Sequence, residues 1–491
     1  MLDDFRPLEL ITLAVYLLAL LWIGLRSARQ VKTSIDYVLA GRQVPGLIVL
    51  ATTAATMVGG AMSVGFVSRV YEIGIAGAFV TIGAYLSLIC TGLWIAPKLR
   101  GLNLITVGDY FDLKFGKFAR FIAVVLCINT MGAAVLAQMV AMGTIANTVL
   151  GLQYEYAVLI GAAVTIFYST AGGLSAVIKT DVLQFVILVG GFGIAAVILC
   201  MDGDGFSAMA ERVGSEHFEL TSKWSGTRVV TFMCAVFLGE SLAVPFVTRC
   251  FISKNPAGAR WGVAGAGFLL LAFLPLVTLI LGTAALASPT VNEAVAAAGG
   301  DVQIAFPTLM RTAFHPLFAG LMIAAIIAAV MSSADSCLSS LATVAMEDVY
   351  RQLKPNATDL QLLRVARWTT AIAGVVTACL AYFYRDIVDI IEFAYDFWGA
   401  TIVLPFVVGT FFYSKAWVLP TVIAMVAGFI ASGSWRMAGV PYDFSPALFG
   451  FCVSIVTLFL AYVICRIFVG FRRVDSPEWD DEALGPRTNT D

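Results

Sequence analysis

The sequence predicts an all-helical protein that crosses a membrane about thirteen times, and three observations lead to this fold class. Of its 491 residues, 60% are hydrophobic and only 13% are charged, whereas a water-soluble chain carries about 25% charged residues. Apolar runs of about 20 residues, enough to cross the hydrocarbon core as helices, recur along the whole chain. Two of these runs are interrupted by glycine or proline at corresponding places, which predicts two related halves.

The apolar runs follow one another with short polar connections. In chain order they cover residues 8–25, 45–67, 75–97, 119–149, 156–172, 175–200, 229–250, 262–287, 316–346, 366–384, 388–413, 416–435 and 447–470. The first run is preceded by acidic residues and followed by basic ones, without a small-residue cleavage site. It is therefore expected to stay as a membrane anchor.

The positions of the basic residues predict how the chain is oriented. Cytoplasmic loops are enriched in Lys and Arg. With thirteen spans and an external N-terminus, most of the 30 basic residues fall on the cytoplasmic side. A missed or extra span would invert every later loop and remove this bias. The hypothesis is an integral protein of the bacterial inner membrane, with its N-terminus outside and its C-terminus inside.

The spacing of the two interrupted runs predicts how the chain is divided. They are five spans apart, as a five-plus-five inverted repeat requires. The repeats would cover residues 45–200 and 229–413. The whole chain would then contain an N-terminal helix with its loop, a transport core, two C-terminal helices and a cytoplasmic tail, over residues 1–44, 45–413, 414–470 and 471–491.

The composition excludes several classes of function. A net charge of −2 does not suit a protein that binds nucleic acid. Only two histidines are present, no HExxH motif occurs, and the nine cysteines form no CxxC pair. No phosphate-binding loop is present either. The sequence therefore predicts neither an enzyme nor an organic cofactor.

The interruptions within the apolar runs predict an ion-coupled transporter. Gly59 and Gly60 lie in the middle of run 45–67, and Gly239 and Pro245 lie within run 229–250. Glycine and proline weaken the helical ladder and free backbone carbonyls. For each run taken alone, the alternative interpretation is that its glycines only allow neighbouring helices to pack closely. The matched spacing of the two runs favours a transporter.

The ninth apolar run is rich in hydroxyl groups, which favours a sodium site. Sodium is a hard cation and is expected to prefer oxygen ligands, as other hard cations do. Ser332 and Ser333 could supply hydroxyls opposite the carbonyls freed in run 45–67. Ser336 is four residues after Ser332, so the two share a helix face, with Asp335 beside them. A membrane serine can instead bond to its own helix, but the clustering favours an ion site.

Acidic residues at membrane depth are costly and usually mark a pathway or a site. Five of them lie within or beside the apolar runs: Asp181, Glu240, Asp335, Glu392 and Asp396. A position at a helix end is the structural alternative, and it weighs most for Glu392 and Asp396. Because Asp181 and Asp335 could titrate, proton coupling is the closest rival to sodium coupling, and a solute sensor derived from a transporter is a further alternative.

In these features the sequence resembles members of the sodium:solute symporter family. Residues 172–184 resemble the family pattern GG-x-x-AV-x-x-TD-x-x-Q, and residues 329–336 with 347–350 resemble its second signature. Residues 40–42 and 56–60 are similar to the choline-transporter branch, and Arg249 fits the family pattern. The resemblance implies two inverted five-helix repeats and alternating access driven by a sodium gradient.

The resemblance also implies the ion ligands. A main sodium site would use the carbonyls of Ala55, Val58 and Ala329 and the hydroxyls of Ser332 and Ser333. Some members have a second sodium site, and the matching positions here are Asp181, Ser332, Asp335 and Ser336. One or two sodium ions per cycle therefore follow from the resemblance, and sodium is the expected coupling ion.

The solute is predicted less directly. A choline site would surround the quaternary ammonium with aromatic rings. By the resemblance, the choline-transporter branch is expected to have aromatic residues at two positions that are Met57 and Ala243 in this chain. The carboxylates instead favour a solute with a positive group, an amine or an amino acid. The candidate solute-binding residues are Met57, Gly59, Gly60, Glu240 and Asp396. The expected partners are this solute, sodium and membrane lipid, with the chain a monomer or a weak oligomer.

Overall fold

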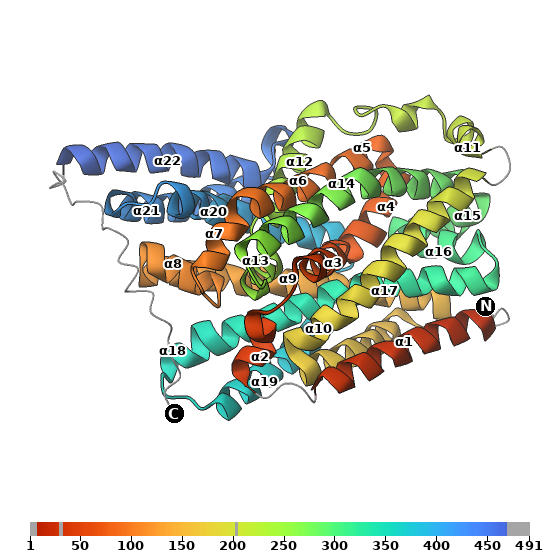
Figure 1. Ribbon diagram of the computed structural model, residues 1–491. Helices are drawn as coiled ribbons and strands as arrows, with labels where there is room; N and C mark the ends of the chain where they lie inside the picture. Colours follow the sequence, from red (N-terminus) through yellow and green to blue (C-terminus); the bar gives the residue numbers. More distant parts are fainter. Residues whose placement is uncertain (1–6, 29–32, 202–204, 469–491) are drawn as a thin grey trace.

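The computed structural model describes residues 7–28, 33–201 and 205–468, and almost all secondary structure within them is helical. The long helices run roughly along one common direction (Figure 1). They are α1 (Pro7–Ala28), α9 (Lys117–Leu150), α10 (Tyr154–Met201), α14 (Pro256–Ala287), α17 (Pro316–Thr343), α19 (Asp359–Leu380), α20 (Ile387–Phe411), α21 (Lys415–Met437) and α22 (Pro446–Phe468). The predicted tail, 471–491, lies outside the described residues.

Shorter helices complete the bundle. Those that form bent or segmented spans are α3 (Gly46–Met57), η2 (Ala61–Gly65), α4 (Phe66–Ile73), α5 (Ile75–Phe79), α6 (Ile82–Cys90), η3 (Thr91–Ile95), α7 (Ala96–Gly101), α12 (Gly226–Glu240) and α13 (Val244–Ile252). Those at the ends of the spans are α2 (Ser34–Leu39), η1 (Ala40–Arg42), α8 (Val107–Phe115), α11 (Gly205–Val213), η4 (Ser215–Phe218), α15 (Pro289–Ala297), η5 (Val302–Ile304), α16 (Ala305–Thr312), η6 (Val344–Tyr350), α18 (Arg351–Leu353) and η7 (Pro441–Asp443).

Each predicted apolar run lies mostly in helix. Within the described residues, ten helices are long and apolar enough to cross a membrane, and two bent pairs raise this number to twelve. The remaining run, 156–172, is the first part of α10, where the apolar helix Tyr154–Phe167 is shorter than a full span. Gly173, with a φ of 55° that only glycine adopts easily, separates it from the second part of α10.

The two interrupted runs are both bent, as predicted. α3 and the helix that follows it meet at 58°, and α12 and α13 meet at 43°. The first break falls at residues 58–60. The second falls at residues 241–243, between Gly239 and Pro245, where Leu242 has a φ of 61°. Pro245 is the second residue of α13 and costs no helical hydrogen bond, because the N–H groups of the first turn have no acceptor within the helix.

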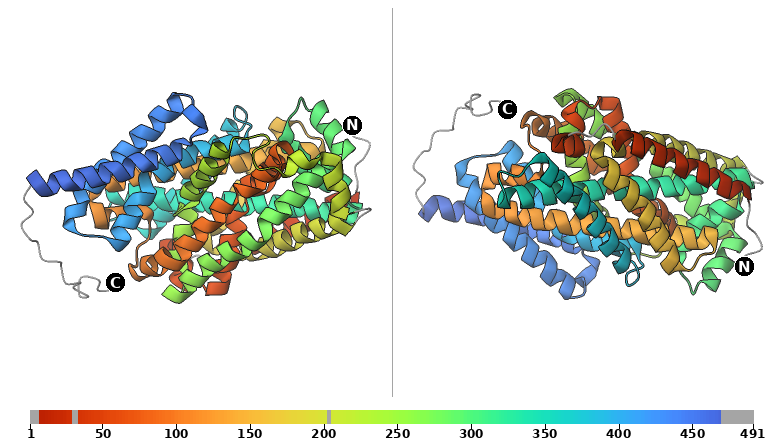
Figure 2. Two further views of the ribbon diagram at one scale, coloured as in Figure 1. Left: turned by 90° about the horizontal axis from the view of Figure 1, so that it is seen from above. Right: turned by 90° about the horizontal axis from the view of Figure 1, so that it is seen from below.

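α17 lies at the centre of the bundle. Every residue from Met322 to Thr343 is buried, and α1, α3, α9, α10 and α19 pack against it. Its many Ala and Ser side chains allow neighbouring backbones to approach closely. In contrast, α21 and α22 run along the outside of the bundle (Figure 2) and expose large apolar side chains, as lipid-facing helices do. The hydroxyl-rich run is therefore in the protein interior.

Candidate functional site

The break after α3 places carbonyls that have no partner within their own helix in the middle of the bundle. α3 ends at Met57, and Val58 leaves the helical conformation at φ −88° and ψ 64°. The last carbonyls of a helix have no partner within it. Here the carbonyls of Ala55 and Thr56 accept hydrogen bonds from side chains of α17 instead. The end of the helix thus presents oxygen atoms to the hydroxyl-rich run.

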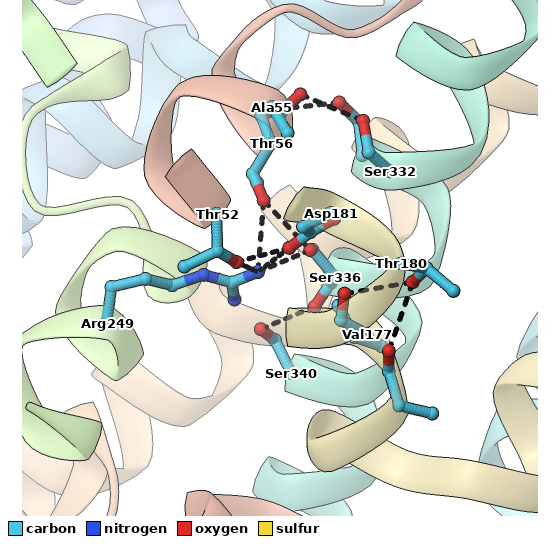
Figure 3. A network of polar contacts seen from close by, with 12 residues as sticks. Thr52, Ala55, Thr56, Val177, Thr180, Asp181, Arg249, Ser332, Ser336 and Ser340 are labelled. Carbon is cyan, nitrogen blue, oxygen red and sulfur yellow. Dashed lines mark hydrogen bonds and ion pairs between the residues drawn. The ribbon is translucent and has the colours of Figure 1, made fainter. Parts of the chain in front are cut away.

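The two adjacent serines of α17 face this break. The Ser332 hydroxyl donates to the carbonyl of Ala55 at 2.8 Å and to that of Ala329 at 2.9 Å, as Figure 3 shows for Ala55. The Ser333 hydroxyl donates to the carbonyl of Thr56 at 2.6 Å. Both serines are buried. This cluster of carbonyl and hydroxyl oxygens has the donor chemistry that sodium requires.

The structure thus brings together most of the atoms expected in the main sodium site. Ala55, Ala329 and Ser332 are in direct contact. Val58 is fully buried at the break itself. The contact between Ser333 and Thr56 was not expected, because sequence alone does not show which freed carbonyl each hydroxyl faces.

Two of the four residues expected in a second sodium site, Asp181 and Ser336, contact a positively charged side chain. Arg249 of α13 reaches between α3, α10 and α17 (Figure 3). Its Nη2 lies 3.1 Å from the carboxylate of Asp181 and 2.6 Å from the Ser336 hydroxyl. Asp335 is buried beside Ser336 on α17, and Ser332 belongs to the cluster at the break. In this arrangement, a guanidinium contacts oxygens that were assigned to a sodium ion.

Two threonines of α3 complete the surroundings of Arg249. The hydroxyls of Thr52 and Thr56 lie 3.2 Å and 3.0 Å from Nη2. Sequence analysis did not identify either residue. The spacing of four residues, which puts both hydroxyls on one helix face, was the available signal.

A cavity of about 570 Å³, including its open mouth, lies between the two breaks. Its walls come from both broken spans and from α9, α17 and α20. The lining residues are Thr56, Met57, Gly59, Ala61, Met62, Thr130, Met131, Ala134, Gln138, Glu240, Ala243, Pro245, Phe246, Ser333, Cys337, Ile391, Ala394 and Tyr395. Because Ser333 and Thr56 line it too, the cavity directly adjoins the cluster of oxygens predicted to form the main sodium site.

Three of the five predicted solute residues line this cavity: Met57, Gly59 and Glu240. Of the described residues, Gly60 and Asp396 are not part of its lining. The N–H of Gly60 donates to the side chain of Gln138 at 2.7 Å. Asp396 forms an ion pair with Arg436 of α21, which neutralises its charge away from the cavity. The assignment of Asp396 to the solute is therefore not retained.

Glu240 is the one acidic residue of the cavity lining. It ends α12 at the second break and accepts a hydrogen bond from the Tyr395 hydroxyl of α20. Sequence analysis did not identify Tyr395, since no local pattern relates two residues 155 positions apart. Gly239 allows this arrangement, because a Cβ there would lie 2.0 Å from the Tyr395 ring.

Comparison with known proteins identifies the family to which this site belongs. The model of the sodium:solute symporter family matches residues 37–428. The chain belongs to the sodium:solute symporter family. Its similarity to individual members is distant but covers nearly the whole chain.

Three relatives illustrate the range of solutes. The chain is 27% identical to a sodium/glucose cotransporter of Vibrio parahaemolyticus, over 87% of this chain and 83% of that protein. It is 24% identical to the high-affinity proline transporter PutP of Bacillus subtilis, over 91% of this chain and 96% of that protein. It is 28% identical to the high-affinity choline transporter 1 of Caenorhabditis elegans, over 77% of this chain and 69% of that protein.

A solved structure shares the fold. A Na+-coupled sialic acid symporter in a substrate-bound, outward-open state matches with a TM-score of 0.80 at 22% identity, over 94% of this chain and 98% of that one. This match shows the fold. Membership of the sodium:solute symporter family makes the chain a sodium-coupled transporter that works by alternating access, with Na+ as its coupling ion. The expected fold class and the resemblance are confirmed.

Proposed function

We propose that this symporter imports a small organic amine, amino acids included, together with sodium bound at the main sodium site. The observation that carries the proposal is the Glu240 carboxylate on the cavity wall. A carboxylate at membrane depth is costly unless it meets a positive partner. Among the residues that line the cavity, none is basic, so a positively charged solute group supplies this partner.

The rest of the lining favours an amine over the other solute classes. A quaternary ammonium is best held by several aromatic faces, and Phe246 and Tyr395 are the aromatic residues of the lining. A monocarboxylate would be repelled by Glu240. A primary or secondary ammonium can donate hydrogen bonds to Glu240 while its apolar part contacts Met57 and the neighbouring side chains.

The shared end of α3 supports coupling between sodium and solute. Ala55 belongs to the main sodium site, whereas Met57 and Gly59, two and four residues later, line the cavity. Sodium bound at the break orders the segment that the solute contacts. Each ligand then raises the affinity of the other by the same factor, and the sodium gradient drives accumulation.

The arrangement in the membrane is part of the proposal. The distribution of basic residues supports a bacterial inner-membrane protein with its N-terminus outside and its C-terminus inside. The two bends support a division into repeats 45–200 and 229–413, which would move against each other between the outward- and inward-open states. The chain is proposed to act as a monomer or a weak oligomer. Reporter fusions at the C-terminus test the orientation, and a fusion active only outside would contradict it.

A thermal-shift screen of the purified protein in detergent tests the function. Amines, amino acids, sugars, carboxylates and vitamins are added with sodium or with potassium in its place. We expect stabilisation by an amine only when sodium is present, because bound sodium raises the affinity for the solute and a ligand that binds the folded state stabilises it. Stabilisation by sugars or monocarboxylates and by no amine would contradict the solute class.

Uptake into proteoliposomes by the same solute then separates transport from sensing. Sodium-driven accumulation is expected. Binding without accumulation would identify a sensor, and uptake driven by a pH gradient without sodium would identify proton coupling.

A further inference from the structure

His217 is one of the two histidines of the chain, and it is buried at one end of the bundle. It lies in η4, which together with α11 forms the outer segment between α10 and α12. His217 is 8% exposed, whereas His315 is an exposed residue. Its Nε2 lies 3.3 Å from the hydroxyl of Thr283 on α14, which is fully buried. In the proposed orientation, this segment lies outside the membrane.

The backbone of His217 packs against the end of the first broken span. α4 ends at Gly74, where the chain turns into α5 with a φ of 70°. This left-handed conformation favours glycine. A Cβ at Gly74 would also lie 2.1 Å from the carbonyl oxygen of His217, so that no larger residue fits. The side chain of His217 therefore contacts α14, while its backbone contacts the end of α4.

These two contacts cover the end of a tightly packed interface between α4 and α14. A Cβ at Gly282, next to Thr283, would lie 2.5 Å from the side chain of Val70. His217 thus joins two helices exactly where their packing ends. The outer half of the broken span, Ala61–Ile73, begins in the wall of the cavity. A change at His217 can therefore reach the cavity through one helical segment.

The surroundings of His217 favour the neutral form of its imidazole ring. Burial lowers the pKa of His217 below its ordinary value, which is about 6.5. α5 carries no charged residue, and the α14 residue in contact is the neutral Thr283. On η4, α11 and α4 and directly after η4, the described charged and titratable residues are exposed or bonded to other partners: Glu216, Glu219, Glu211, Arg212, Glu72, Arg69 and Tyr71.

We propose that His217 is a pH-sensitive clasp that holds the outer segment over the ends of α4 and α14, and that acid on this side of the membrane releases it. Protonation would place an unbalanced charge in a buried position, so the protonated ring favours the released arrangement. The clasp is therefore at full strength above about pH 6.5 and weakens as the pH falls below this value. Release frees the outer half of the broken span and favours the opening of the cavity.

Labelling of Cys337 with a thiol reagent tests the proposal on the purified full-length chain in detergent. Cys337 lines the cavity, so its labelling rate reports opening without any knowledge of the solute. The rate of the wild type is divided by that of His217→Gln at each pH, which cancels the pH dependence of thiol chemistry. This quotient should rise up to about tenfold from pH 7.5 to pH 5.5, where an ordinary histidine is about ten parts protonated to one part neutral. His315→Gln is the matched control and should behave as the wild type does.

A second measurement uses the wild type itself. Deuterium exchange at the C2–H of the histidine rings, resolved by mass spectrometry, gives the pKa of each histidine. We expect His217 to titrate at a lower pH than His315. Thr283→Val removes the hydroxyl partner at nearly the same size. Its Cys337 labelling at pH 7.5 should be about two- to tenfold faster than in the wild type, as the loss of one hydrogen bond implies.

A quotient that stays constant between pH 7.5 and pH 5.5 would overturn the proposal, because any effect of acid would then come from the carboxylates that both proteins share. Titration of His217 at or above the pH of His315 would overturn it as well. If His217→Gln does not fold, the exchange measurement and Thr283→Val decide. None of these outcomes depends on the solute or on the main sodium site, so the proposed function is tested separately.

Discussion

Ser332 and Ser333 are neighbours in the chain but contact different carbonyls of the broken helix. Ser332 joins Ala55 to Ala329, whereas Ser333 reaches Thr56 at the edge of the cavity. One hydroxyl therefore connects the end of α3 to the backbone of α17, and the other lies at the wall of the cavity. Both are buried.

Removing either hydroxyl should weaken sodium binding more than it weakens the fold. For Ser332→Ala and Ser333→Ala we expect an apparent sodium affinity at least about tenfold lower, a loss of about 1.4 kcal/mol, because each variant removes one ion ligand. Sodium titration of thermal stability measures it. Ser340→Ala is the control, and unchanged sodium activation in both variants would exclude these serines from the site.

Glu240 and Asp396 were predicted to share one role, but their surroundings differ: Glu240 lines the cavity, and Asp396 is paired with Arg436. Glu240→Gln should reduce solute affinity at least about tenfold, or about 1.4 kcal/mol, because the ammonium loses its charged partner, while Glu240→Asp should retain part of it. Asp396→Asn should leave solute selectivity unchanged and lower the melting temperature, because Arg436 loses its ion-pair partner. Sodium-dependent solute binding and thermal unfolding distinguish the two residues. Loss of selectivity in Asp396→Asn with wild-type solute affinity in Glu240→Gln would contradict this.

Sequence could identify these acids but not their partners. A carboxylate in an apolar run is visible without a structure. Tyr395 beside Glu240, and Arg436 beside Asp396, are not, since partners on other helices follow from helix packing and rotation. The oxygen-rich stretch of α17 was visible for the opposite reason, because its pattern is local.

At the scale of helices, the site depends on where two spans break. The breaks were predictable from Gly59, Gly60, Gly239 and Pro245, since glycine and proline act on their own backbone. The second break lies at residues 241–243, where Leu242 has a positive φ, and this could not be predicted because leucine does not favour it. Both broken spans also pack against α17 and α20, contacts that the sequence alone does not reveal.

Gly59→Ala tests how closely the first break must approach α17. A Cβ at residue 59 would lie 2.4 Å from the Ser333 Oγ, so Ser333 must move away from the carbonyl of Thr56. We expect sodium affinity to fall at least about fivefold, or about 1 kcal/mol, with the protein still folded. Gly190→Ala is the control, because a Cβ there would meet nothing within 4 Å. Equal sodium affinity in both variants would show that the close approach is not needed.

At the scale of the whole molecule, ion pairs lie at both ends of the bundle. Arg69 of α4 contacts Asp389 at the start of α20, 3.2 Å away. Arg120 of α9 contacts Asp348 in η6, at the end of α17, 2.8 Å away. α19 carries the chain from the η6 end back to the start of α20, so the two pairs are at opposite ends. In the proposed orientation, the Arg69 pair is outside.

The Arg69 pair joins the outer half of the first broken span to α20, and both elements line the cavity. Loss of the pair should therefore favour the arrangement in which the cavity opens outward. Arg69 is 19% and Asp389 is 64% exposed, and an ion pair this exposed contributes only about 0.2–1 kcal/mol. For Arg69→Gln, we expect a small shift in population, up to about fivefold.

Cys337, which lines the cavity, reports this shift. A membrane-impermeant thiol reagent is added from outside, and labelling of Cys337 is followed by site-resolved mass spectrometry because the chain has nine free cysteines. Labelling in Arg69→Gln should be up to about fivefold faster than in wild type. Arg385→Gln is the control, since it removes a positive charge whose partner is Glu155 rather than α20. If Arg69→Gln slowed the labelling, or both variants accelerated it equally, the pair would not hold the outer end closed, and the opening of the cavity would depend on apolar packing between the broken span and α20.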